Sequence, residues 1–308
     1  MKAIQLTAYG SPSGMTLVEA DDPVPGDNEV LIDVAAASVN PIDWKIVSGA
    51  MRAFIPLPLP FTPGVDAAGT VIAVGRNVTT LKPGDEVMGF IGIVGAFATR
   101  AIVESTRLAR KPASLTFAEA AAIPAATLTA WQALHEHGGL QAGQSVLIHG
   151  AAGGVGTAAA QLAKLAGAHV IGTGSAQSRE YVASLGADAF IDYRTEDFAA
   201  RVLGLDLVLD LIGGETQERS WSVLKPGGTL VSTVARPDAG RAKGTQATGR
   251  HFATRSDAPQ LEKLATLHAS GDLRTHIDSV FALTDVSQAL DHSKGGHVKG
   301  KVVVAVAQ

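Results

Sequence analysis

One short segment constrains the fold of this 308-residue chain more than any other. A strand-like run, residues 145–149, leads into a loop of small residues, 150–156, and a helical pattern follows over 155–166. Gly167 ends that helix, and a second strand-like run covers 169–173. A strand, a crossover helix and a second strand make a βαβ unit, and such units build parallel sheets with helices on both faces. The segment therefore predicts an α/β domain with a doubly wound parallel sheet.

The loop has the residue spacing of a dinucleotide-binding turn. Ala151, Gly153 and Gly156 match the G-x-G-x-x-G pattern, with alanine in the first position. Small residues let the backbone approach a pyrophosphate, and the positive end of the following helix faces the phosphates. A strand–helix turn without a ligand is the alternative, but the flanking strands and helix are the context that supports binding. We predict that the cofactor contacts five loop residues: Ala151, Gly153, Gly154, Val155 and Gly156.

The end of the second strand bears on the choice between NADH and NADPH. An NAD-selective site usually carries an acidic residue there, about 20 residues after the loop, to bind the ribose 2′-hydroxyl. Residues 172–179 contain no acid, and the first one is Glu180. Ser175 can donate to a 2′-phosphate and Arg179 can supply positive charge, although Arg179 could instead be a solvated helix residue. This pattern predicts NADPH.

The rest of the chain differs in character on either side of this region. Strands alternate with helices as far as residue 233, whereas the first ~110 residues read as short strands and turns. The last ~35 residues return to that earlier style. We predict a β-rich domain made of residues 1–112 and 273–308, interrupted by an α/β domain over 113–272.

The composition excludes several classes of function. The chain has no cysteine, which excludes disulfides, thiolate zinc sites, iron–sulfur clusters and a cysteine nucleophile. Its net charge is −4 with scattered basic residues, so we expect no nucleic-acid partner. No uninterrupted apolar run is long enough for a membrane span, and the N-terminus lacks a signal-peptide pattern. We expect a cytoplasmic protein without a membrane partner.

Six segments resemble the medium-chain dehydrogenase/reductase superfamily, and specifically its zinc-independent quinone oxidoreductase branch. They are Ala37–Asp43, Pro63–Gly69, Lys82–Val87, Ala126–Trp131, His149–Gly156 and Ile191–Arg194. The resemblance covers essentially the whole chain. It implies a GroES-like catalytic domain built from both chain ends, an intervening Rossmann domain, and a homodimer formed through a strand edge of the Rossmann domain.

The chain departs from the zinc-dependent members of that superfamily at their metal ligands. Those members have a Cys ligand at the position of Asn40, and a His-Glu pair where this chain has Val65 and Asp66. Their four-Cys structural lobe would follow the 82–87 turn, but here 88–101 runs directly to the next strand. We therefore predict no metal site.

The resemblance implies NADPH-dependent hydride transfer to quinones or other α,β-unsaturated carbonyls. Asn40 and Lys45 are the predicted catalytic residues. Asn40 matches a position at the nicotinamide and can donate to cofactor or substrate, or it could only brace the turn at Pro41. Lys45 stands where many relatives have tyrosine; it could stabilise or protonate an enolate, or be a surface cation. An apolar group around Trp44 and 54–59 would suit a small hydrophobic quinone or enone.

Four further residues are predicted to contact the cofactor. Thr129 matches a cofactor-facing helix position, although a buried threonine often bonds its own helix backbone. Tyr193 matches a family tyrosine beside the 2′-phosphate, with packing in a βα loop as the alternative. Ile212 is expected at the adenine or ribose wall, with a place in the core as the alternative. Thr233 is expected at the carboxyl edge of the sheet, where such sheets bind ligands. Lys301 matches a family lysine, with a structural role as the alternative.

Two other functions are compatible with the sequence. An enoyl-thioester reductase would need basic groups for a phosphopantetheine arm, and Arg52 is the strong candidate near the expected substrate region. A non-catalytic NADPH-binding sensor or structural protein would keep the cofactor site without turnover.

Overall fold

The computed structural model describes residues 1–242 and 246–306, which form two compact units. Unit 1 contains Met1–Ala125 together with the chain from Ser256 onward, and unit 2 contains Ala126–Arg255. One unit is therefore inserted into the other along the sequence.

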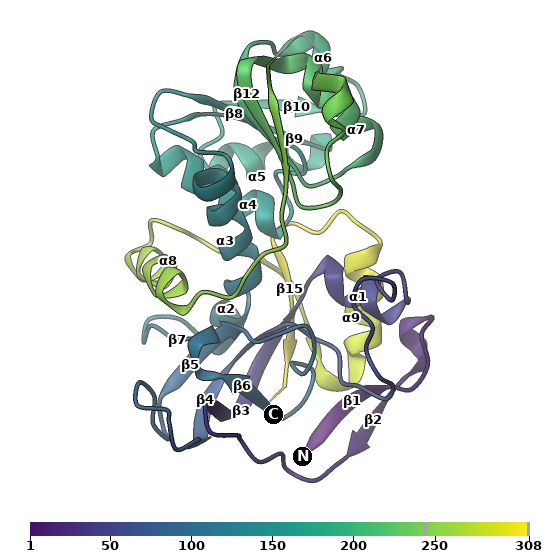
Figure 1. The fold of residues 1–308 in the computed structure, drawn as a ribbon, viewed down its shortest axis with the longest axis vertical. Coiled ribbons are helices and arrows are strands. Elements are labelled where there is room, and N and C mark those ends of the chain that lie inside the picture. The colour runs from purple at the N-terminus through teal and green to yellow at the C-terminus, as the bar shows by residue number, and fades with distance from the viewer. Residues whose placement is uncertain (243–245, 307–308) are drawn as a thin grey trace. The chain divides into compact units, whose positions relative to one another are not determined.

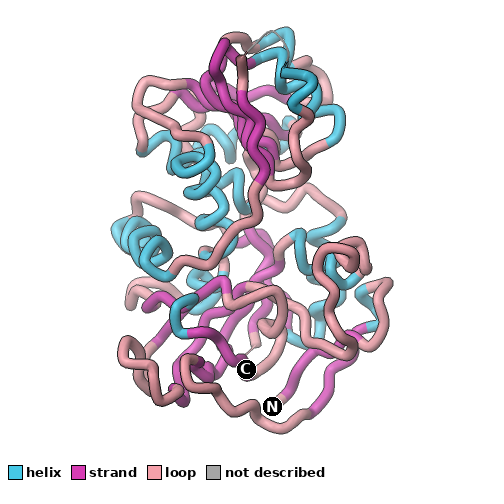
Figure 2. The backbone as a smooth tube through the Cα atoms, viewed as in Figure 1, coloured by secondary structure: helices cyan, strands magenta, loops and turns pink. Residues whose placement is uncertain are grey.

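Unit 1 is built on one mixed sheet (Figure 2). In spatial order its strands are β14 (Ile277–Ala282), β15 (Lys301–Ala305), β3 (Glu29–Val39), β4 (Asp66–Val74), β5 (Glu86–Phe90) and β7 (Leu108–Arg110). β6 (Arg100–Glu104) also pairs with β3, and β1 (Lys2–Leu6) pairs with β2 (Met15–Glu19). The long β3 is antiparallel to β4, β6 and β15, so it joins segments from both ends of the chain.

The helices of unit 1 surround this sheet. They are α1 (Pro41–Val47), α2 (Phe117–Ala121), α8 (Ala258–Ser270) and α9 (Val286–Lys294), with 3₁₀ turns η1 (Pro12–Gly14), η2 (Ser105–Arg107) and η7 (Leu283–Asp285). Strong local signals bound α8: the Asp257 carboxylate accepts from Gln260 N at 2.9 Å, and Gly271 ends the helix at φ +83°.

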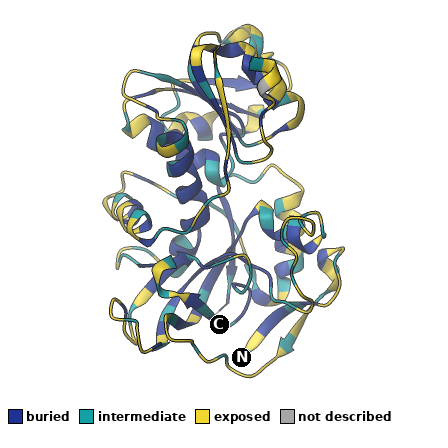
Figure 3. Ribbon diagram, viewed as in Figure 1, coloured by how far each residue is buried: buried dark blue, intermediate teal, exposed yellow. Residues whose placement is uncertain are grey.

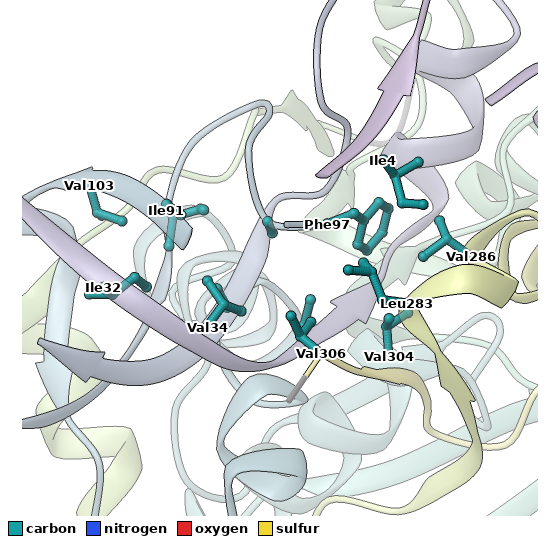
Figure 4. Packing of buried hydrophobic residues seen from close by; sticks show 14 of the residues in the cluster. Ile4, Ile32, Val34, Ile91, Phe97, Val103, Leu283, Val286, Val304 and Val306 are labelled. Carbon is teal, nitrogen blue, oxygen red and sulfur yellow. The ribbon is translucent and has the colours of Figure 1, made fainter. Parts of the chain in front are cut away.

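The core of unit 1 lies where the central strands meet β1 and α9 (Figure 4). Ile32 and Val34 of β3 and Val304 of β15 pack in one apolar cluster with Ile4 and Phe97. The burial of apolar area in such a cluster is the main favourable contribution to folding. These strands are thereby held in fixed register, which positions the polar residues at their ends.

Unit 2 contains a parallel sheet (Figure 1). In spatial order the strands are β10 (Ala189–Asp192), β9 (His169–Gly174), β8 (Ser145–Ile148), β11 (Leu205–Asp210), β12 (Leu224–Ser232) and β13 (Thr248–His251). The central strands are buried along most of their length (Figure 3). The strand order reverses between β8 and β11, and ligands of doubly wound sheets bind at the carboxyl ends of the strands beside such a point.

The helices of this part of the chain connect successive strands. They are α3 (Pro124–Trp131), α4 (Gly154–Leu165), α5 (Arg179–Ser184), α6 (Phe198–Arg201) and α7 (Gly214–Ser220). A π-helical turn η3 (Gln132–His137) extends α3, and shorter 3₁₀ turns are η4 (Ala176–Ser178), η5 (Trp221–Val223) and η6 (Ala239–Ala242). The predicted fold class, a GroES-like sheet domain plus a doubly wound Rossmann sheet, is confirmed.

The boundaries between the two compact units differ from the predicted domain boundaries. The prediction placed 113–272 in the α/β domain, whereas 113–125 and 256–272 group with unit 1. The reason is packing: α2 lies against β3 and β4, and α8 lies against β7. Among the helices within the described ranges, none is both long enough and apolar enough to cross a membrane.

Candidate functional site

The residue at the end of β3, Asn40, has its side-chain amide held by unit 1. Nδ2 donates to Asp66 Oδ2 at 2.8 Å and to Ser38 O at 3.4 Å, while Oδ1 accepts from Lys301 Nζ at 2.7 Å. Strand register brings these residues together, because Ser38 lies opposite Asp66, and Val39 lies opposite Val302, the residue after Lys301. The network fixes which way the Asn40 amide faces.

Asp66 and Lys301 form a buried ion pair behind that amide. Their side chains are 3.6 Å apart between Nζ and Oδ2, and the residues are 0% and 4% exposed. Lys301 also donates to Val39 O at 3.0 Å. The other oxygen of Asp66 accepts from Ala125 N at 3.0 Å, at the start of α3, where the helix dipole favours an anion.

Asp43, in the first turn of α1, supplies a second buried carboxyl group to this cluster. Its Oδ2 accepts from Asn40 N at 2.7 Å, and its Oδ1 has no hydrogen-bond partner among the described residues. Burial, reinforced by the charge of Asp66, raises the pKa of Asp43 to about 8. With Asp43 protonated, the cluster of Asp43, Asp66 and Lys301 carries no net charge, which is the least costly state to bury.

This geometry bears on the two predicted catalytic residues, both in unit 1. Each amide hydrogen of Asn40 already has an internal acceptor, so donation to a ligand would use the weaker contact, at 3.4 Å. Lys45 in α1 is half-buried, with Nζ 5.5 Å from the centroid of the Trp44 ring. No carboxylate of the described chain lies within 4 Å of it, so its ammonium is free to meet an anionic group. Both catalytic assignments stay predictions.

The glycine loop of unit 2 has the close packing that its spacing predicts. Gly150 has φ +73°, and Ala151, fully buried, donates its N–H to Thr173 O at 3.0 Å. A Cβ on Gly156 would lie 2.3 Å from Gly150 O and 2.7 Å from Ala151 Cα, so only glycine fits where α4 meets the loop. The first turn of α4 thereby lies directly on the end of β8.

The loop leaves space for a ligand at one of its glycines. A Cβ on Gly153, the N-cap of α4, would meet only Gly150 O, at 3.6 Å, so the loop is open at that residue. The first N–H groups of a helix have no acceptor within the helix and suit phosphate oxygens. Ile212 Cδ1 lies 3.2 Å from the ideal Cβ position of Gly150, so this half-exposed side chain lies beside the loop, and its contact with a cofactor stays a prediction.

The predicted 2′-phosphate residues meet at the ends of β9 and β10. Tyr193 N donates to Gly174 O at 3.1 Å, so Tyr193 lies next to the residue that precedes Ser175. Arg179, by contrast, is held by its neighbours: its guanidinium is 3.2 Å from Glu196 Oε1 and 4.8 Å from the Phe190 ring centroid. Arg179 is therefore not simply a solvated helix residue, because its guanidinium already has a carboxylate partner.

Sequence reasoning missed Arg194 as a candidate at this place. Its guanidinium lies 5.8 Å from the centroid of the Tyr193 ring, and no carboxylate within the described ranges pairs with it. The sequence signal that could have identified Arg194 is its position, two residues after the end of β10. Of the two arginines near the ends of β9 and β10, Arg179 has a carboxylate partner and Arg194 has none in the described ranges.

The last two predicted cofactor residues also have defined partners. Thr129 Oγ1 is 2.6 Å from Thr254 Oγ1, so its hydroxyl pairs with a residue 125 positions away. Thr233 follows β12, and its N–H donates to Asp210 O at 3.3 Å. The buried Asp210 carboxylate accepts from Gly213 N at 2.8 Å and from Ser232 Oγ at 2.7 Å, which shapes both strand ends.

His149, at the end of β8, is a buried residue with a structural role and a pH signature. Its ring nitrogens lie 3.2 Å from Thr173 Oγ1 and 3.0 Å from Ser220 Oγ. Burial lowers the pKa of His149 to about 4. In the unfolded chain the value returns to the ordinary one, so between pH 6.5 and 4 the unfolded state binds an extra proton.

The free energy of unfolding is therefore expected to fall as pH falls from about 6.5 to 4, by about 3 kcal/mol from this one group. Urea unfolding at pH 7 and pH 4.5 measures the change. His149→Gln keeps hydrogen-bonding capacity without the titration, and is expected to show a shallower loss. An equal pH dependence in both proteins would contradict this assignment. Burial also lowers the pKa of His268 to about 4, so part of the dependence remains in the variant.

Comparison with known proteins identifies the family of this chain. Two family models match the chain: the alcohol dehydrogenase GroES-like domain over residues 26–113 and zinc-binding dehydrogenase over 185–304. The chain is 35% identical over 325 residues to the chloroplastic quinone-oxidoreductase QR1 of Triphysaria versicolor, covering 99% of this chain and 98% of that protein. It is 37% identical over 321 residues to the 2-methylene-furan-3-one reductase of Solanum lycopersicum, covering 99% and 79%.

Solved structures with a similar fold also include quinone oxidoreductases. The quinone oxidoreductase of Escherichia coli complexed with NADPH has a TM-score of 0.92 at 28% identity, covering 99% of this chain and 100% of that one. The quinone oxidoreductase from Coxiella burnetii has a TM-score of 0.90 at 33% identity, covering 100% and 99%. The chain belongs to the quinone oxidoreductase branch of the medium-chain dehydrogenase/reductase superfamily, and it is an oxidoreductase.

Proposed function

We propose that this protein reduces quinones or α,β-unsaturated carbonyls by hydride transfer, with NADPH as the cofactor and without a metal ion. The observation that carries the proposal is the glycine loop, where Gly156 leaves no room for a side chain and Gly153 leaves the loop open. Two relatives support the substrate class by name, a quinone-oxidoreductase and a 2-methylene-furan-3-one reductase. A structural neighbour complexed with NADPH supports the cofactor.

In this proposal the chain's own residues bind and orient the cofactor and stabilise the charge that develops on the substrate. The loop and the first turn of α4 hold the phosphates, while Ile212 and Thr233 line the carboxyl edge of the sheet. A bound reduced nicotinamide supplies the hydride. Negative charge then develops on the substrate oxygen, and Lys45, with no carboxylate partner in the described chain, is our candidate to stabilise it. Asp43, with its raised pKa, holds a proton next to Asn40 at neutral pH.

The absence of a metal requirement is proposed from the residues themselves. The chain has no cysteine, and the position of the zinc-binding Cys in zinc-dependent members is Asn40. Next to the Asn40 amide stands the Lys301 ammonium, 2.7 Å from Oδ1, a cation that would repel a metal ion from this site. Nowhere in residues 1–242 and 246–306 do three His, Asp or Glu side chains group closely enough to bind a metal.

The function is tested by following NADPH oxidation across a panel of quinones, enones and enoyl thioesters, with a chelator present throughout. We expect turnover of a quinone or an enone that the chelator leaves unchanged. Turnover of the thioesters alone would favour the enoyl-thioester reductase. NADPH binding with no oxidation by any acceptor would favour a sensor or structural protein. Activity that is lost in chelator and restored by zinc would overturn the metal-free mechanism.

Cofactor preference gives a sharper prediction at the 2′-phosphate. We expect NADPH to bind at least about tenfold more tightly than NADH, since a charge-assisted contact contributes about 1.5–3 kcal/mol. Arg194→Gln is expected to remove most of that preference. The matched variant Arg179→Gln is expected to keep it, because Arg179 is held by Glu196. Fluorescence titration with both cofactors measures the ratio, and the opposite ranking would restore Arg179 as the phosphate ligand.

Assembly and localisation are also proposals. β10 and β13 are the edge strands of the unit 2 sheet as described, and either could form the predicted homodimer. The predicted cytoplasmic location stays a prediction, and the names of relatives include chloroplastic and mitochondrial proteins.

A further inference from the structure

A cavity lies in unit 2 at the edge strand β13. Its volume is about 330 Å³, and it is lined by His137, Arg236, Pro237, Gly249, Arg250 and His251. This volume is at the lower end of the range of small-ligand sites. β13 is three strands from β8 in the sheet, a separation of about 14 Å at the usual strand spacing, so the cavity is distinct from the loop.

The fold builds this cavity from close packing around an edge strand. β13 pairs with β12 on one side, and a Cβ on Gly249 would lie 2.8 Å from the Trp221 ring and 2.9 Å from Pro237 Cβ. Glycine therefore lets β13 lie against the segment that carries Arg236. From η3, the ring of His137 stacks on Phe252 at 4.2 Å between centroids. These packing contacts fix the backbone positions of the residues that line the cavity.

The lining of the cavity carries positive charge and includes no acidic side chain. No acidic residue is among its six lining residues, and neither Arg236 nor Arg250 has a carboxylate within 4 Å in the described chain. Other arginines of unit 2 do pair with carboxylates: Arg179, Arg201, Arg219, Arg241 and Arg255. Burial, together with the charges of Arg250 and Arg255, lowers the pKa of His137 although Glu136 opposes this. Hollows lined by one sign of charge concentrate ions of the other sign.

We propose that this cavity is a second anion site, which binds the phosphate group of a phosphorylated ligand. Two guanidinium groups offer the planar, paired donors that suit phosphate oxygens, and His137 and His251 add ring donors. The ligand is either a free phosphate compound or the phosphate end of a carrier such as a phosphopantetheine thioester. The inference goes beyond quinone reduction and does not depend on turnover.

The test is calorimetric titration of the full chain with inorganic pyrophosphate, first alone and then with saturating NADPH, which occupies the glycine loop. We expect binding in both conditions. Arg236→Gln and Arg250→Gln are each expected to weaken pyrophosphate binding about tenfold, the effect of one lost charge-assisted contact, with the NADPH Kd unchanged. Arg201→Gln, an exposed arginine of α6 paired with Glu196, is the control with the same change in charge.

Absence of pyrophosphate binding, or equal weakening in the control, would overturn the proposal. An NADPH Kd that rises in the two cavity variants would also overturn it, since the cavity would then belong to the cofactor site. Failure of NADPH to bind at all would count against the proposed function, whereas pyrophosphate binding lost in the cavity variants would still support this site.

Titration with coenzyme A and with pantetheine separates the two sources of phosphate. Binding of coenzyme A that weakens in Arg250→Gln, with no binding of pantetheine, supports the anion site and identifies a phosphorylated carrier. Binding of pyrophosphate without coenzyme A supports the site with a small phosphate compound as its ligand.

Discussion

Lys301→Met is expected to lower the free energy of unfolding by about 3–5 kcal/mol, because it leaves the buried Asp66 carboxylate without its cation. Lys301 and Asp66 are both buried, and the ammonium also holds Val39 O at 3.0 Å and Asn40 Oδ1 at 2.7 Å. Methionine has a similar length, so the loss reports the charge and the hydrogen bonds more than volume. Urea unfolding at pH 7 measures it.

Two further variants separate the charge pair from general damage. Asp66→Asn combined with Lys301→Met removes both charges and leaves a carboxamide facing Asn40, so most of the lost stability is expected to return. Lys294→Met, on an exposed position of α9, is expected to change stability by less than about 0.5 kcal/mol. A double variant as unstable as Lys301→Met alone would contradict the ion-pair argument.

The architecture of unit 2 could be predicted because its signals are local. The strand, loop and helix of 145–166 follow one another in the sequence, and the structure has them as β8 and α4 within a residue at each end. β13 was missed, since Thr-Gly-Arg-His has no apolar alternation. All four of its residues are exposed, so no buried face imposed a pattern. α8 was also missed, although it had cap signals in Asp257 and Gly271.

The site shows the same division between local and distant contacts. The close approach of Gly156 to Gly150 follows from spacing over seven residues, so sequence reasoning could find it. Two partners of the Asn40 amide, Asp66 and Lys301, are 26 and 261 residues away, and only the strand register of unit 1 joins them. Arg179 looked like a free cation in the sequence, because its partner Glu196 lies 17 residues further on.

Gly156→Ala is expected to weaken NADPH binding about a hundredfold or more, a change of about 2.7 kcal/mol or more in binding free energy. The added Cβ would sit 2.3 Å from Gly150 O and 2.7 Å from Ala151 Cα, both backbone atoms that cannot give way without moving the loop. The start of α4 would shift from β8, taking its N–H groups out of line with the phosphates. Overpacking of this kind also costs about 1–3 kcal/mol of stability.

Gly153→Ala is the matched variant that separates ligand binding from folding. Its Cβ would meet only Gly150 O at 3.6 Å, and Gly153 has φ −74°, which alanine adopts freely. Its stability is therefore expected to stay within about 0.5 kcal/mol of wild type. Its NADPH Kd is expected to rise about tenfold, because the second glycine of the pattern lets the backbone reach the pyrophosphate. Fluorescence titration beside thermal unfolding measures both quantities. If Gly153→Ala keeps the wild-type Kd and Gly156→Ala loses only stability, the loop is a structural turn and the cofactor binds elsewhere.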